Sequence, residues 1–324
     1  MVNRILLLGS GFSRNWGGPL ASEMFDSLLQ QPQISADQHL RQILWQHKDG
    51  GGFENALAQV QQDFRNNAVL PEHKRWLDGF QAAIDRIFAD MDRGFARRPS
   101  WEFTNQRDQM LLGTLVKFDA IFSLNQDLLF ERFYFNDSVM LESGQRWSGV
   151  IMPGVRERRD HSFPYDPGKS RWMPVSKSEF KVESRFQPYF KLHGSWRWED
   201  GTGQQLMVMG ASKALTISGH PVLAWYQSEF ERRLRGDTRL MVIGYGFNDP
   251  HINEAILRAT QGSTLKMFIV DPLGVDVANP DRSLRLQRPN PFKDVIHGSS
   301  RRALDEIFGS DAVAHINVTR FLEP

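Results

Sequence analysis

Five short fragments rich in polar residues and glycine follow apolar runs along the chain, and their residue types could do chemistry. Glycines beside serines let backbone N–H groups approach a phosphate, an Asn side chain can hold a water or a hydroxyl, and a His can accept a proton. In an open parallel sheet, the carboxyl ends of the strands line one ligand crevice. We therefore expect the fragments to converge on one site. They are residues 7–13 (LLGSGFS), 123–127 (SLNQD), 191–194 (KLHG), 242–249 (VIGYGFND) and 269–271 (IVD).

The glycine turn after the first apolar run is suited to a phosphate, because its backbone N–H groups are accessible. A full dinucleotide-binding fingerprint has a third glycine and, about 20 positions later, a strand that ends in an acidic residue. Here Arg14 stands in place of the third glycine, and the acidic strand end is missing. A tight turn that merely needs glycine explains the fragment equally well. The turn consists of Gly9, Ser10, Gly11, Phe12 and Ser13.

Asn125 and Asp127 stand two residues apart where the second apolar run turns into a helix. Asp127 could simply cap that helix, since Asp is favoured at such positions. Asn125 is harder to explain structurally. Its carboxamide can donate and accept together, so it could hold a water or a hydroxyl.

His193 is the candidate base. It follows the strand-like residues 189–192 and precedes Gly194, which would leave space for a ligand. A lone histidine is more often structural than catalytic, but the other eight of the nine histidines have no comparable setting. None of them forms a spacing typical of a metal site, so we expect no metal.

Another glycine-rich fragment closes a later apolar run. Gly244 and Gly246 suit a second close backbone approach to a ligand, and Asn248 follows them. Asp249, with a proline directly after it, is typical of a helix cap. Asp271 ends the last strong apolar run, where its carboxylate could bind ribose hydroxyls or, equally well, begin a turn.

The elements that must position these residues alternate as in an α/β protein. Helical spacing of apolar residues separates the strand-like runs, and this rhythm predicts a Rossmann-like parallel sheet with helices on both faces. Residues 1–29 and 105–324 would form this domain. The strand-like runs are residues 5–8, 119–124, 189–192, 206–209, 239–243 and 265–270.

Two segments interrupt the alternation. Residues 30–104 show helical periods and predict an inserted helical subdomain, whose longest apolar stripe runs from Trp76 to Phe95. One small subdomain could not easily bury so wide a stripe alone. Residues 136–187 are rich in Pro, Gly and Arg and predict an irregular insertion loop. We expect both segments to control the site rather than build it; the alternative is that they merely cover the sheet.

The loop carries side chains of the kinds that are enriched where protein partners dock. Its basic residues alternate with acidic ones, which argues for a solvated or partner-contacting loop and against nucleic acid. The side chains are Trp147, Arg156, Arg158, Arg159 and Trp172.

Composition excludes several classes of protein. The 324 residues include no cysteine, which rules out disulfides and cysteine-ligated metal sites and fits a cytoplasmic location. A net charge of +1 gives no basis for direct nucleic-acid binding. No apolar run approaches the roughly 20 residues of a membrane helix. The apolar residues 5–8 are too few for a signal peptide and end in the glycine turn.

In their order and spacing, the fragments resemble the sirtuin superfamily. They are most similar to its bacterial sirtuin-like branch, which occurs in NAD-depleting defence proteins. The resemblance covers residues 5–25, 119–133, 189–195 and 239–272. The turn at residues 9–13 resembles the family's Gly-Ala-Gly-x-Ser, Asn125 and Asp127 its Asn-x-Asp, His193 and Gly194 its catalytic His-Gly, and Gly244 and Gly246 its later glycine motif.

This resemblance implies a pocket in which NAD is the substrate and no metal is needed. Asn125 would position the attacking water or the ribose hydroxyls, His193 would accept a proton, and Asp127 would contact the nicotinamide end. The glycine turn would hold the pyrophosphate. The implied activity is NAD hydrolysis to nicotinamide and ADP-ribose, in the NAD-depleting effector of an anti-phage system. The family further implies a homo-oligomer and a partner such as a translocase-type ATPase or another sensor.

The chain also departs from the sirtuin pattern, and these departures limit the activities that the resemblance implies. Sirtuin deacylases have a four-cysteine zinc module, a Gln where Leu124 stands and an acidic-aromatic-arginine run where residues 19–22 read PLAS. Lysine deacylation is therefore not expected. One alternative is a non-catalytic sensor of NAD or an ADP-ribose derivative, which would need neither Asn125 nor His193. The other is a nicotinamide oxidoreductase, which the incomplete fingerprint disfavours.

Overall fold

The computed structural model describes residues 2–103, 110–135, 146–158, 166–210, 213–262, 264–279 and 290–323. Its centre is a seven-stranded sheet in which every pair of neighbouring strands is parallel, in the order β11-β10-β9-β1-β2-β6-β3. The order reverses between β1 and β9, so a ligand crevice is expected outside the carboxyl ends of these two strands. The strands are β1 (Asn3–Leu8), β2 (Ala120–Ser123), β3 (Val150–Ile151), β6 (Gln187–Lys191), β9 (Thr238–Ile243), β10 (Lys266–Val270) and β11 (Ile296–Ser300).

Helices cover both faces of this sheet. Successive residues of a strand point to opposite faces, and Ile5 through Leu8 in β1 are all fully buried, as are Ala120 through Phe122 in β2. The prediction of a Rossmann-like α/β fold is therefore confirmed. The helices of this domain are α1 (Ser10–Arg14), α7 (Met110–Leu115), α8 (Leu129–Phe133), α9 (Lys213–Gly219), α10 (Pro221–Arg233), α11 (Pro250–Thr260) and α12 (Ala312–Thr319). Shorter turns are η1 (Lys177–Glu179), η2 (Gly274–Ala278), the π-helical η3 (Glu306–Ser310) and η4 (Arg320–Leu322).

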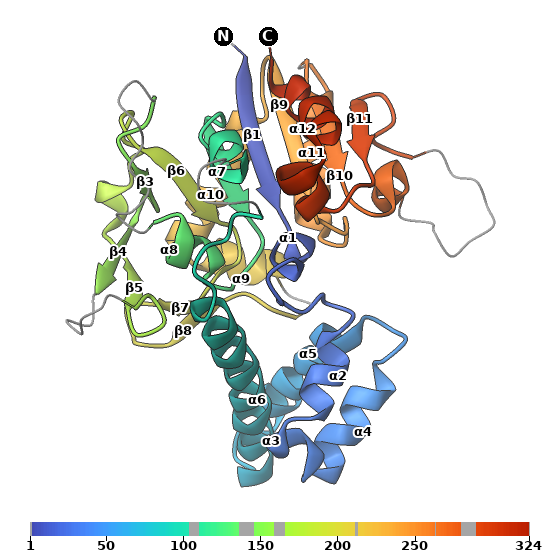
Figure 1. Cartoon of the computed structure of the whole chain (residues 1–324). Helices are drawn as coiled ribbons and strands as arrows, with labels where there is room; N and C mark the ends of the chain where they lie inside the picture. Colours follow the sequence, from blue (N-terminus) through green and yellow to red (C-terminus); the bar gives the residue numbers. More distant parts are fainter. Residues whose placement is uncertain are drawn as a thin grey trace.

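A helical insert lies beyond the carboxyl end of β1, opposite the two termini (Figure 1). Its wide apolar stripe does not stay exposed: Phe80, Ile84 and Phe88 are buried in a second core, which also takes in Leu128 and Trp196 of the α/β domain. The insert is thus docked against the sheet domain through shared apolar packing. Its helices are α2 (Met24–Leu29), α3 (Pro32–Ser35), α4 (Gln38–Gln46), α5 (Gly52–Asn66) and α6 (Pro71–Ala96).

The segment predicted as an irregular loop instead contains strands. β4 and β5 pair with each other, and β5 joins β7 and β8 in a four-stranded sheet. These strands are too short to show a period in sequence, and β5 pairs with a distant one. The two loop tryptophans, Trp147 and Trp172, are buried, so they do not form a docking surface. The strands are β4 (Val155–Arg158), β5 (Arg171–Pro174), β7 (Gly194–Glu199) and β8 (Gln205–Met207).

The basic side chains of this segment remain on the surface. Arg156 and Arg158 are exposed, and Arg156 forms an ion pair with Glu179 at 3.4 Å. Arg159 lies outside the described residues. Within the described ranges, the longest helices are too polar or too short to pass through a lipid bilayer.

Candidate functional site

A cavity of about 680 Å³ opens at the carboxyl ends of the central strands, between the sheet and the helical insert. Its volume falls within the roughly 300–1,000 Å³ typical of small-molecule and cofactor sites. A cavity of about 700 Å³ beside the small sheet is lined by none of the predicted site residues. Eight of those residues line the first cavity: Gly9, Ser10, Ser13, Asn125, Asp127, His193, Gly246 and Asn248.

The remaining predicted residues lie outside its lining. Phe12 is fully buried, with its ring 5.0 Å from that of Trp16 and 5.6 Å from that of Phe130. It packs α1 onto α8. Asp271 is half-buried after β10, and its Oδ1 accepts a hydrogen bond from the N–H of Leu273 at 2.9 Å.

Gly11 and Gly244 were expected to let the backbone approach a ligand, but they let two turns of the backbone approach each other. Gly244 has a φ of +63°, and a Cβ there would lie 2.4 Å from the carbonyl carbon of Gly11. A Cβ on Gly9 would lie 2.5 Å from the carbonyl oxygen of Gly244. The N–H of Gly11 donates to that oxygen at 2.9 Å. These glycines let the turns after β1 and β9 come into direct contact, which fixes the two strand ends relative to each other.

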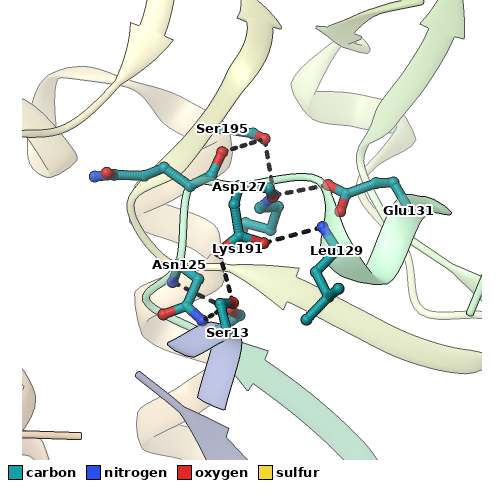
Figure 2. A network of polar contacts seen from close by, with 9 residues as sticks. Ser13, Asn125, Asp127, Leu129, Glu131, Lys191 and Ser195 are labelled. Atoms are coloured by element: carbon teal, nitrogen blue, oxygen red, sulfur yellow. Dashed lines mark hydrogen bonds and ion pairs between the residues drawn. The ribbon is translucent and has the colours of Figure 1, made fainter. Parts of the chain in front are cut away.

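Ser13 joins the two polar residues that follow β2 (Figure 2). Its Oγ donates to Oδ2 of Asp127 at 2.7 Å and accepts from Nδ2 of Asn125 at 2.9 Å. Oδ1 of Asp127 accepts from the N–H of Leu129 at 3.0 Å, so Asp127 also holds the start of α8. This bond fits the helix-capping explanation of Asp127, and its functional role stays a prediction. Three side chains from distant segments are fixed relative to one another.

A buried ion pair supports this loop from behind. Lys191 at the end of β6 and Glu131 in α8 are both fully buried, and their charged atoms lie 2.7 Å apart. Lys191 Nζ also donates to the carbonyl of Asp127 and, at 2.8 Å, to Ser195 Oγ, as Figure 2 shows. Burial raises the pKa of Glu131, although Lys191 opposes the shift. Sequence reasoning missed this pair, although a lysine ending an apolar strand was the signal that could have found it.

His193 lies at the next strand end, buried against a second histidine. Its Nε2 is 3.0 Å from Nε2 of His251, the second residue of α11. Burial lowers the pKa of His193 to about 3, while the Asp249 carboxylate opposes that shift and Lys213 adds to it. Burial also lowers the pKa of His251. Both imidazoles are therefore neutral at pH 7.

Gly194 does not open space for a ligand beside His193. Its φ is +68°, and a Cβ there would lie 2.2 Å from the carbonyl oxygen of Leu206. The glycine is needed because β8 approaches the backbone closely at this point. The strand end is thus shaped by the small sheet, which the sequence did not predict.

An ion cluster completes this side of the cavity. Lys213 Nζ lies 2.7 Å from Asp249 Oδ1 and 2.7 Å from Glu54 Oε1. Burial would raise the pKa of Asp249, but His193, Lys213 and His251 outweigh it and hold the pKa below its usual value. As expected, Asp249 precedes α11 with a proline at the first helical position. Its side chain does not cap the helix, however, and faces Lys213 instead.

The helical insert also lines the cavity, contrary to the expectation that it would only control the site. Lys48, residues 51–55, Phe88 and Met91 form this part of the wall. The three consecutive glycines at residues 50–52 were the available signal, because they allow the chain to pass close to a ligand.

The chain is similar to known sequences and structures of one kind. A family model described as a SIR2-like domain matches residues 119–288, which is more than half of the 324 residues. A Sir2 homologue solved in complex with NAD is 12% identical, with 99% of this chain and 89% of that chain covered and a TM-score of 0.40. A Sir2 homologue mutant bound to 2'-O-acetyl ADP-ribose is 14% identical, with 99% and 94% covered and a TM-score of 0.40. The search of curated proteins finds no match.

Proposed function

The chain belongs to the SIR2-like domain family, and from this premise we propose that it hydrolyses NAD to nicotinamide and ADP-ribose. The observation that carries the proposal is that Asn125 and His193 line one cavity together with the turn at Gly9 and Ser10. An amide that can orient a hydroxyl or a water, an imidazole that can accept a proton and a backbone turn suited to phosphate are the groups that this reaction needs.

In this mechanism, the pyrophosphate of NAD binds at the turn after β1, and the nicotinamide ribose points toward Asn125 and His193. The bond between nicotinamide nitrogen and the anomeric carbon breaks, and its electron pair leaves with nicotinamide. The oxygen of a water forms the new bond to that carbon, while His193 accepts the proton from the water or through a ribose hydroxyl. Asp127, held by Ser13, contacts the nicotinamide end.

Positioning accounts for much of the expected rate enhancement. A water held in line with the breaking bond avoids the entropy cost of a bimolecular encounter. Asn125 can hold it in this way because Ser13 and the buried Lys191–Glu131 pair fix the loop that carries it. A base whose pKa lies near the working pH contributes about 10²- to 10⁴-fold more, and the Asp249 carboxylate is the group that raises the pKa of His193 toward that range.

We further propose that the reaction depletes cellular NAD in an anti-phage defence system, with the chain as its effector in a homo-oligomer or beside a sensing partner. The sequence resemblance to NAD-depleting defence proteins supports this extension. Regulation is required in such a system, because a constitutive NAD hydrolase would kill its own cell.

Chromatographic separation of products after incubation with NAD tests the activity. We expect equal amounts of nicotinamide and ADP-ribose, and no O-acetyl-ADP-ribose when an acetyl-lysine peptide is added, since the chain has no cysteine for the deacylase zinc module. NAD that binds but stays intact with every candidate activator would support the sensor alternative. Stoichiometric O-acetyl-ADP-ribose would instead show a deacylase.

A further inference from the structure

We propose that His193, Asp249 and His251 form a binding site for a Zn²⁺-class transition-metal ion, and that the bound ion switches off NAD hydrolysis. The regulatory half of this proposal rests on the proposed function, whereas the binding half does not. The three residues offer two imidazole nitrogens and one carboxylate oxygen, the donor set that zinc and related divalent ions prefer. Hard ions such as Mg²⁺ prefer oxygen ligands and do not suit it.

The three residues are already gathered closely enough to share an ion. One ligand atom from each lies within 4.8 Å of the others, and the two Nε2 atoms are 3.0 Å apart. Zinc–nitrogen bonds are about 2.0–2.1 Å long, so two ligand atoms of one tetrahedral ion lie ~3.4 Å apart. The widest pair must therefore close by up to about 1.4 Å, which side-chain rotation can supply. Asp249 and His251 are two residues apart at the start of α11, while His193 comes from the end of β6.

The surrounding charges favour a cation. The Asp249 carboxylate acts on both imidazoles and Glu254 on that of His251, while Lys213 carries the opposing positive charge and is itself paired with Glu54. Lys213 engages only Oδ1 of Asp249, and no hydrogen bond to Oδ2 is formed by the described residues. The amino end of α11 also opposes a cation. We therefore expect an affinity below that of a structural zinc site.

His193 cannot bind the metal ion and accept a proton at the same time. A neutral imidazole has one nitrogen that accepts a proton, and that nitrogen is also the one that binds a metal. Three protein ligands leave a further coordination position open. Because His193 and Asp249 line the cavity, this position faces the space proposed for NAD. A bound ion would thus remove the base and narrow the pocket together.

Equilibrium dialysis of the metal-free full chain against Zn²⁺, followed by metal analysis, measures the binding half. We expect one ion per chain, and Co²⁺ in its place should give the visible absorption of a nitrogen- and oxygen-ligated ion. His251→Ala and Asp249→Asn should each lower the affinity at least tenfold. The matched control is His297→Ala, which removes an exposed histidine on β11 and should leave the affinity unchanged.

The variant Lys213→Met distinguishes the loss of a metal ligand from general damage to the pocket. Removing this cation should tighten Zn²⁺ binding, whereas general damage to the pocket would weaken it. Thermal unfolding of each metal-free variant shows whether it is folded. The proposed site is refuted if the wild type does not take up one Zn²⁺ per chain. It is also refuted if folded His251→Ala takes up as much Zn²⁺ as the wild type.

The regulatory half is measured as nicotinamide release with and without stoichiometric Zn²⁺. We expect at least a tenfold loss of rate in the wild type and no loss in His251→Ala relative to its own metal-free rate. An increase in rate with Zn²⁺ would overturn the inhibitory role. Zinc uptake by a wild type that releases no nicotinamide in metal-free buffer with any candidate activator would refute the proposed function while leaving the metal site standing.

Discussion

The two walls of the cavity are built in different ways. The sheet wall consists of Ser13, Asn125, Asp127 and His193, and the insert wall of Lys48, residues 51–55, Phe88 and Met91. In the sheet wall, hydrogen bonds of 2.7 and 2.9 Å join side chains of different segments, and a fully buried ion pair supports them. The charged link from the insert wall is Glu54, whose side chain is 31% exposed where it meets Lys213.

From this difference we infer that the two walls have different roles. Chemistry requires groups held within a fraction of an ångström, and the buried network provides that precision. Binding and release of a large substrate require a wall that can move, and the Glu54–Lys213 pair, partly open to water, is easier to break than the fully buried Lys191–Glu131 pair. We therefore place catalysis on the sheet wall and substrate access on the insert wall.

The largest expected effect comes from removing the reactive side chains of the sheet wall. Asn125→Ala and His193→Ala should each lower nicotinamide release by ~10²-fold or more, because a positioned water or a base is lost. Steady-state kinetics give the rate, and thermal unfolding confirms that the chain is folded. Asn66→Ala and His297→Ala, at exposed positions, are the matched controls. Either active-site variant with a near-normal rate would remove that residue from the mechanism.

The support behind the sheet wall should matter chiefly for stability. Lys191→Met leaves Glu131 buried without its partner, and such a loss costs about 3–5 kcal/mol of unfolding free energy. Denaturant titration measures it. Lys191→Met combined with Glu131→Gln should recover part of the loss, because no uncompensated charge remains. A cost below ~1 kcal/mol for Lys191→Met would show that the pair does not hold the loop.

The insert wall should respond in substrate affinity. Glu54→Gln breaks the link to Lys213 at a cost of about 1 kcal/mol or less. We expect a KM for NAD that rises severalfold with little change in kcat. Glu231→Gln is the control, because Glu231 is about as exposed as Glu54 and forms a 2.8 Å ion pair with the more exposed Arg258, and neither residue lines the cavity. A fall in kcat alone would place Glu54 with the chemistry.

The smallest effect on the cavity is expected from the arginines at residues 156–159. Charge reversal at Arg156, Arg158 and Arg159 should weaken self-assembly or activation by a partner while NAD affinity stays the same. Light scattering gives the oligomeric state, and calorimetry gives the affinity. Unchanged assembly and unchanged activity would show that this segment only covers the domain.

The two walls also differ in how much of them could be predicted from the sequence. The parallel sheet and eight residues of the cavity lining could be predicted, because apolar runs ending in glycine or polar residues reflect a local rule about strand ends. Phe12 belonged to the same run, yet its burial against Phe130 depends on α8, which comes more than 100 residues later in the chain.

The insert wall and the metal-ligand cluster depend on contacts that no local pattern contains. Glu54 meets Lys213 across 159 positions, and His193 meets His251 across 58. The short strands β4 and β5 were missed for the same reason, since their pairing rather than their composition defines them. Asp249 could be placed at a helix start from the proline after it, but the direction of its side chain could not.

The central claim is that the sheet wall cleaves NAD rather than only binding it. Parallel measurement of NAD binding and nicotinamide release, in the wild type and in Asn125→Ala, tests it most directly. The account predicts that both proteins bind NAD with affinities within a few fold of each other, while only the wild type releases nicotinamide. Binding by the wild type without release under any activating condition, or equal release by both proteins, would contradict it.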